Sequence, residues 1–91
     1  MATVLLAIGD TDARSDPFTL AAGEEATLIF RPGAGSTARD AIGIEVQDSD
    51  EGWVAVAGGR LNSGNSPLVL CAPGTYSLTR TEGTNAGADK A

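Results

Sequence analysis

The sequence predicts an all-β protein, a small β-sandwich or jelly roll of about seven to eight short antiparallel strands. Apolar residues recur mostly at every second position, which places one set of side chains in a core and the other in solvent. Twelve glycines and nine threonines among the 91 residues favour turns and strands. Signals for turns recur about every ten residues, a spacing typical of sandwiches. We expect a single domain over residues 1–80.

The first half of the chain is predicted to form three strands, at residues 3–8, 17–20 and 25–31. Asp10 to Asp16 is an acidic segment between the first two strands and is predicted to be a loop. Alternation assigns the core-facing side chains of these strands as Val4, Leu6 and Ile8, then Phe18 and Leu20, then Ala26, Leu28 and Phe30.

The second half is predicted to form four strands, and residues 41–47 show the cleanest alternation, with Ile42, Ile44 and Val46 facing inward. Further strands are expected at residues 53–57, where Gly58-Gly59 ends the pattern, at residues 68–71, and from Thr75 onward. In the last strand Tyr76 and Leu78 face the core. Residues 81–91 contain no large apolar side chain, so we expect a flexible, disordered C-terminal tail.

The charge distribution excludes two classes of partner. Twelve acidic residues oppose six basic ones, for a net charge of −6, and both halves of the chain are acidic. No Lys/Arg cluster is present to release counterions from phosphate, so we expect no direct nucleic-acid binding and no binding to anionic membranes. The apolar run Val4 to Ile8 is too short for a membrane span and has no basic segment before it, so we expect a soluble protein without a leader.

The residue types also limit the chemistry. Without histidine and with one cysteine, the chain cannot build a Ser/His/Asp or Cys/His triad or a zinc site from these residues. We therefore predict no catalytic residues, no cofactor and no enzyme activity. Cys71 follows an apolar run and is expected to be a buried small side chain.

Two acidic loops are candidate cation sites. The first contains Asp10, Asp12 and Asp16, and the second contains Asp48, Asp50 and Glu51. In both, the twelfth position of a calcium-binding EF-hand loop lacks the required glutamate, because Ala21 and Gly59 stand there. We interpret both groups as solvated loop acids, and whether either binds a cation stays open.

One candidate interaction surface follows from the last strand. Its outward residues Thr75, Ser77, Thr79 and Thr81 form an uncharged stripe with high β-propensity, which suits a sheet that packs against another chain. Trp53, the only tryptophan, is interpreted as a core or subunit-contact residue. The alternative is an exposed ring that stacks on a sugar.

Only 19 of the 91 residues are Leu, Ile, Val or Phe, so we expect a thin core that a partner or a second copy completes.

Three segments together resemble short β-rich virion proteins of tailed bacteriophages, particularly head decoration or cement proteins. The segments lie between about residues 15 and 81 and are Phe18-Thr19-Leu20 with Ala22 to Leu28, Asp50-Glu51-Gly52-Trp53, and Leu70 to Arg80. The resemblance implies a small oligomeric sandwich, such as a trimer, that is made in the host cytoplasm and assembled into the virion. Its implied partners are the major capsid protein and copies of itself, with no catalytic residues to carry over. The alternatives are a tail or fibre-associated virion protein, and a carbohydrate- or ligand-binding sandwich that uses Trp53 and Tyr76.

Overall fold

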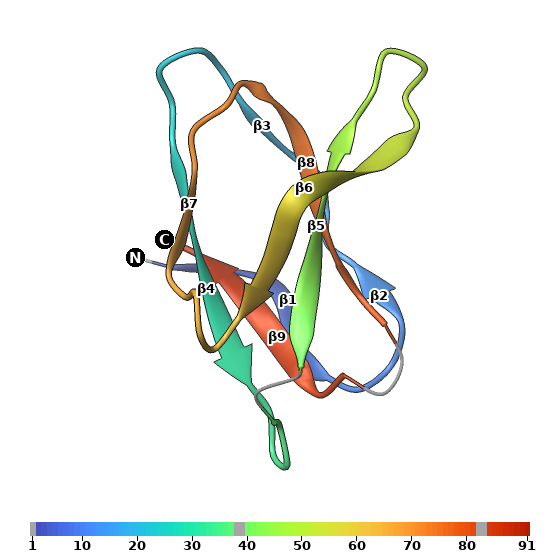
Figure 1. Cartoon of the computed structure of the whole chain (residues 1–91), viewed down its shortest axis with the longest axis vertical. Coiled ribbons are helices and arrows are strands. Elements are labelled where there is room, and N and C mark those ends of the chain that lie inside the picture. Colours follow the sequence, from blue (N-terminus) through green and yellow to red (C-terminus); the bar gives the residue numbers. More distant parts are fainter. Residues whose placement is uncertain (1, 38–39, 82–83) are drawn as a thin grey trace.

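The computed structural model describes residues 2–37, 40–81 and 84–91 and shows two antiparallel β-sheets packed face to face (Figure 1). Sheet A has the strand order β1-β9-β4-β7, and sheet B has the order β2-β8-β5-β6, with β3 also paired to β8. All elements in the described residues are strands: β1 Thr3–Gly9, β2 Ala13–Arg14, β3 Phe18–Leu20, β4 Ala26–Pro32, β5 Ala41–Gln47, β6 Trp53–Asn62, β7 Leu68–Leu70, β8 Gly74–Arg80 and β9 Ala86–Lys90. The predicted all-β class is confirmed, with one or two strands more than expected.

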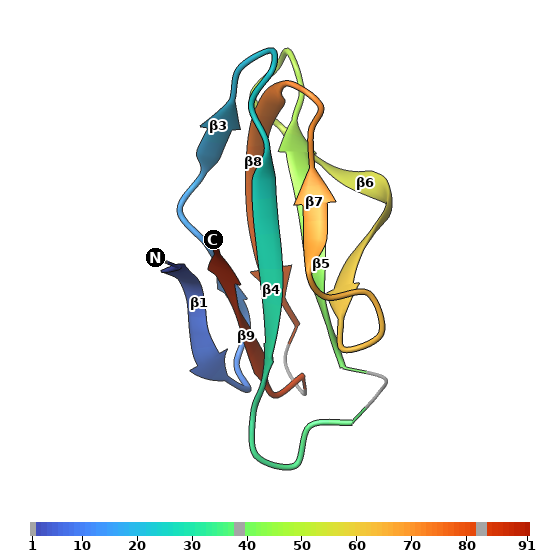
Figure 2. The same ribbon diagram turned by 90° about the vertical axis from the view of Figure 1, so that its left-hand side faces the viewer.

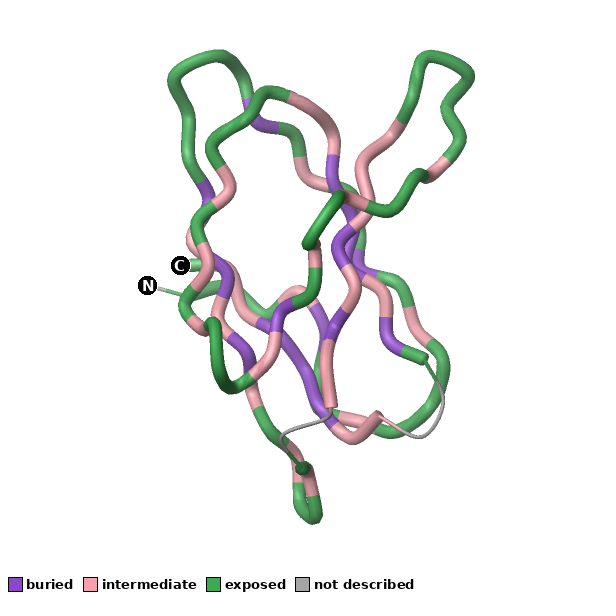
Figure 3. The backbone as a smooth tube through the Cα atoms, in the orientation of Figure 1, coloured by how far each residue is buried: buried purple, intermediate pink, exposed green. Residues whose placement is uncertain are grey.

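The core lies between the two sheets, and Figure 3 shows its buried residues on the central strands with exposed loops at both ends. Strict alternation predicts β4 and β5 correctly and β8 in part, because Ser77 is buried as well as Tyr76 and Leu78. Leu28, Ile42 and Leu78 have no exposed surface, and Ile44 is 1% exposed. These strands are central in their sheets, so one whole face of each is covered by the opposite sheet.

The predicted disordered tail is wrong, because residues 86–90 form the strand β9 in the interior of sheet A. β9 pairs antiparallel with β1 on one side and with β4 on the other. Ala86 and Ala88 are fully buried. Gly87 permits close approach of β1, since a Cβ atom there would lie 2.5 Å from the carbonyl oxygen of Leu6. The sheet therefore continues past residue 80, and small residues are what this position requires.

The inward assignment of β1 is wrong for two of its three residues. Leu6 is buried, but Val4 is 55% exposed and Ile8 is 43% exposed. The register to β9 shifts between Val4 and Leu6 and again between Leu6 and Gly9. Each shift inserts a residue and turns the following side chains to the other face, which simple alternation does not anticipate.

Strand β6 does not end at Gly58-Gly59 but bends there and continues to Asn62 (Figure 1). Glu45 pairs with Ala55 while Gly43 pairs with Arg60, so residues 56–59 oppose Ile44 alone. Gly58 has a φ of 68°, and a Cβ on Gly59 would lie 2.8 Å from the carbonyl oxygen of Val56. Both glycines are therefore needed for this large bulge.

The buried Arg80 ties the two sheets together at one end. Its Nε donates to the carbonyl oxygen of Thr11 at 2.7 Å, and its Nη1 donates to those of Ala7 at 2.6 Å and Ala86 at 2.9 Å. Arg80 comes from sheet B, whereas Ala7 and Ala86 belong to sheet A. One guanidinium thus satisfies carbonyl groups from β1, β9 and the predicted loop of residues 10–16, which itself contains the short strand β2.

Candidate functional site

The candidate site is the outer face of sheet B, the side turned away from sheet A. Antiparallel partners share a face, and three rows of partners run across this sheet. Gln47 opposes Trp53, Glu45 opposes Ala55 and Ser77, and Thr79 opposes Gly43 and Arg14. The core residues Ile44 and Leu78 form a neighbouring row on the other face. Strand order therefore brings the predicted residues Trp53, Thr75 and Thr79 onto one surface.

Arg14 connects the residues of this surface. Its Nη2 lies 2.5 Å from Oε1 of Glu45, and its Cζ lies 5.0 Å from the centroid of the Trp53 ring. The ion pair cancels the two charges on this face, and the guanidinium occupies one face of the indole. We define the sheet B surface as Arg14, Glu45, Trp53, Thr75 and Thr79. The two threonines are half-buried. The hydroxyl group of Thr75 also forms a hydrogen bond with that of Thr19, with 3.0 Å between the oxygens.

Two residues of the predicted stripe do not contribute to the exposed surface. Ser77 is fully buried, because the chain between β2 and β3 lies against it and its Oγ donates to the carbonyl oxygen of Ser15 at 3.0 Å. Ser15 Oγ in turn accepts from the amide of Leu78 at 2.9 Å. Ser77 is thus a structural residue, and its assignment to an exposed stripe is wrong. Thr81 is exposed, but it follows the end of β8.

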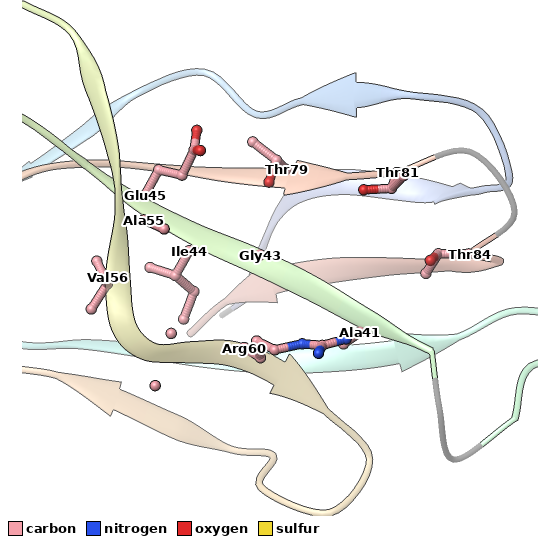
Figure 4. Close-up of a pocket in the computed structure, with 12 residues that line it drawn as sticks. Ala41, Gly43, Ile44, Glu45, Ala55, Val56, Arg60, Thr79, Thr81 and Thr84 are labelled. Carbon is pink, nitrogen blue, oxygen red and sulfur yellow. The ribbon is translucent and has the colours of Figure 1, made fainter.

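A hollow of about 540 Å³ lies beside the sheet B surface, between β5, β6 and β8 (Figure 4). It exists because the bulge of β6 carries that strand away from β5. Buried Ile44 contributes to its lining, and Thr79, Thr81, Thr84 and Arg60 supply hydroxyl and guanidinium groups around it. Figure 4 shows the Arg60 side chain extended along the hollow in the direction of Ala41.

Trp53 and Tyr76 do not form the sugar platform considered as an alternative. Tyr76 is 5% exposed, its hydroxyl donates to the carbonyl oxygen of Ala72 at 2.8 Å, and its ring stacks on Phe18 with 5.8 Å between centroids. It belongs to the core. Trp53 is half-buried and lies on the opposite face of the sheet, with Arg14 against its ring.

The second acidic loop and Cys71 are both exposed. In the second loop Oδ1 of Asp48 accepts from the amides of Asp50 at 2.9 Å and Gly52 at 2.8 Å, which shapes the turn. Across the described residues, no three His, Cys, Asp or Glu side chains are grouped to hold a metal ion, and no helix is long and apolar enough to cross a membrane. Cys71 is exposed, so its predicted burial is wrong: it follows the end of β7 and lies outside the sheet.

Comparison of the chain with protein-family models, curated proteins and solved structures found no match.

Sequence reasoning missed Arg14, Glu45 and the hollow. Glu45 had a usable signal, since it alternates with the buried Ile44 in a clear strand. Arg14 had none, because it lies in a segment that reads as an acidic loop and reaches Trp53 only through the pairing of β2 with β8. The hollow depends on a register shift that no local pattern reveals.

Proposed function

We propose that the protein is a non-enzymatic structural protein of a bacteriophage virion, a head decoration protein that binds the capsid lattice and stabilises it. One observation supports this more than any other: Trp53 and the outward threonines of β8 share a surface on which the charges of Arg14 and Glu45 neutralise each other. A chain with a net charge of −6 would otherwise repel an acidic partner. A half-buried indole on the same face as threonine hydroxyl groups suits a protein interface.

The test uses capsid shells that lack the protein. Wild-type protein should co-sediment with such shells in many copies and should raise the temperature at which they open. Thr79→Glu adds a second carboxylate next to the Arg14–Glu45 pair, which gives the sheet B surface a net charge of −1, and should weaken binding at least tenfold. Thr27→Glu is the matched control, a half-buried strand threonine in sheet A, and should leave binding unchanged.

The location in the particle is tested separately. Mass spectrometry of intact particles should find the chain in many copies per head, and separated tails should lack it. Recovery only with tails would favour the tail or fibre alternative. A wild-type chain that ignores protein-free shells would contradict the proposal altogether.

A ligand-binding module remains the second candidate because of the hollow in sheet B. Its threonine hydroxyls and Arg60 can form hydrogen bonds above an apolar floor, which suits a small polar ligand such as a sugar. A glycan panel with binding measured by calorimetry tests this function. If a glycan binds the wild-type protein, Arg60→Ala should abolish the binding and Arg31→Ala, in sheet A, should keep it. That result would favour a ligand-binding module over a decoration protein.

A further inference from the structure

The outer face of sheet A carries an unusual share of the exposed apolar side chains. Four large hydrophobic residues in the described part of the chain are exposed, and three of them lie on sheet A strands: Val4, Ile8 and Val69. Val4 and Ile29 both oppose Asp89, and Val69 opposes Thr27, so these residues share the outer face. We define the sheet A face as Val4, Ile29, Val69 and Thr27. Figure 2 looks onto it, with β1, β9, β4 and β7 side by side.

The inner face of sheet A is buried, and its outer face leaves two valines in water. Leu28 and Phe30 lie in the core together with small alanines, whereas Val4 is 55% exposed and Val69 is 49% exposed. A partner that covered the outer face would remove this apolar area from water.

The charge on this face suits a second copy of this chain as the partner. The sheet A strands contain three charged residues, Arg31, Asp89 and Lys90. Lys90 opposes the buried Leu28, so on these strands the outer face carries Arg31 and Asp89, whose charges cancel. On this face Nη1 of Arg31 lies 3.5 Å from Oδ1 of Asp89. The neighbouring cation and anion are self-complementary under a two-fold axis, so two acidic copies would meet here with opposite charges facing each other.

A contact of typical size would take up most of this side of the molecule. The whole molecule, loops included, measures 37 Å by 21 Å on this side (Figure 2), and a typical stable interface buries about 800 Å² on each partner. Val4 on the edge strand β1 and Val69 on the opposite edge strand β7 are then both needed.

We propose that two copies of the protein bind each other through their sheet A faces and form a two-fold dimer in which Arg31 of each copy faces Asp89 of the other. This contact is separate from the sheet B surface, which lies on the other side of the sandwich. A trimer, which the phage resemblance implies, would need a different contact because a two-fold face closes at two copies.

Sedimentation velocity and native mass spectrometry of the full chain test the dimer. Wild-type protein should shift from 9.2 kDa towards twice that mass as concentration rises. Val4→Glu and Val69→Glu should each raise the dissociation constant at least tenfold. The matched control is Val54→Glu, which changes a 48% exposed valine on β6 of sheet B and should leave the constant unchanged. Circular dichroism melts confirm that all variants fold.

A mixing experiment tests the two-fold pairing. Arg31→Glu and Asp89→Arg should each stay monomeric alone, because like charges face each other, and should form a mixed dimer when combined. A monomer at all concentrations, a trimer, equal weakening by Val54→Glu, or no mixed dimer would overturn the proposal. Val4→Glu should still bind capsid shells, so a failed dimer and a failed capsid function give different results.

Discussion

Gly87→Ala should destabilise the protein although it adds only one methyl group. Gly87 lies in β9, between the buried Ala86 and Ala88. A Cβ atom at this position would lie 2.5 Å from the Leu6 carbonyl oxygen, 2.8 Å from the Ile8 amide nitrogen and 3.0 Å from the Ala7 carbonyl carbon. All three are backbone atoms of β1, so no side-chain rotation can relieve the overlap.

The expected loss follows from that overlap. β1 must move by about 1 Å to restore ordinary contact distances, and overpacking of this kind costs about 1 to 3 kcal/mol. Alanine also reduces the conformational freedom of the unfolded chain, which stabilises the folded state by about 0.4 to 1 kcal/mol. We therefore expect the free energy of unfolding to fall by about 1 to 2 kcal/mol. For a domain of this size, that corresponds to a fall in Tm of about 5 to 15 °C.

Urea and thermal unfolding followed by circular dichroism measure this loss. Gly64→Ala is the control, since its Cβ would meet only the side-chain oxygen of Asn62, at 3.2 Å, and stability should change by less than about 0.5 kcal/mol. If residues 81–91 were a free tail, Gly87→Ala would leave Tm unchanged or raise it slightly. That result would refute the placement of β9 inside sheet A.

Three further predictions concern single side chains. Arg80→Lys should cost about 1 to 3 kcal/mol in urea unfolding, because one ammonium cannot reach three carbonyl groups on separate segments; an unchanged midpoint would contradict the clamp. Arg14→Ala should cost less than about 1 kcal/mol, as expected for an exposed pair, yet should alter Trp53 fluorescence; identical spectra would argue against the stacked geometry. Cys71 should react with a thiol reagent in the native protein as fast as in the unfolded chain, and a reaction that requires denaturant would show that the thiol is buried.

The sequence predicts the strands that lie in the middle of each sheet and carry large side chains. β4 and β5 alternate without interruption, and Leu28, Ile42 and Ile44 are buried as expected. Both strands pair on two sides and have one face fully covered, so hydrophobic alternation is the main determinant of their geometry.

The strands that the sequence misassigns depend on backbone geometry instead. β9 contains Ala86, Gly87 and Ala88, small residues that allow its backbone to lie close to β1. A pattern of hydrophobic side chains does not predict such close backbone packing. β1 contains two register shifts, so Val4 and Ile8 turn outward despite their alternation. In both cases the determining contact comes from a residue about 80 positions away in the chain.

The candidate surfaces show the same division. The threonines of β8 could be assigned to an outward stripe from the sequence, because they alternate with Tyr76 and Leu78. Their neighbours on the surface could not be assigned, since Arg14 and Trp53 arrive from β2 and β6 through the strand order of sheet B. The same holds for sheet A, where Val4 and Val69 share a face only because β9 and β4 lie between their strands. An interaction surface on a sandwich is thus a property of topology, and the two surfaces can be separated experimentally because Val4→Glu and Thr79→Glu each change only one of them.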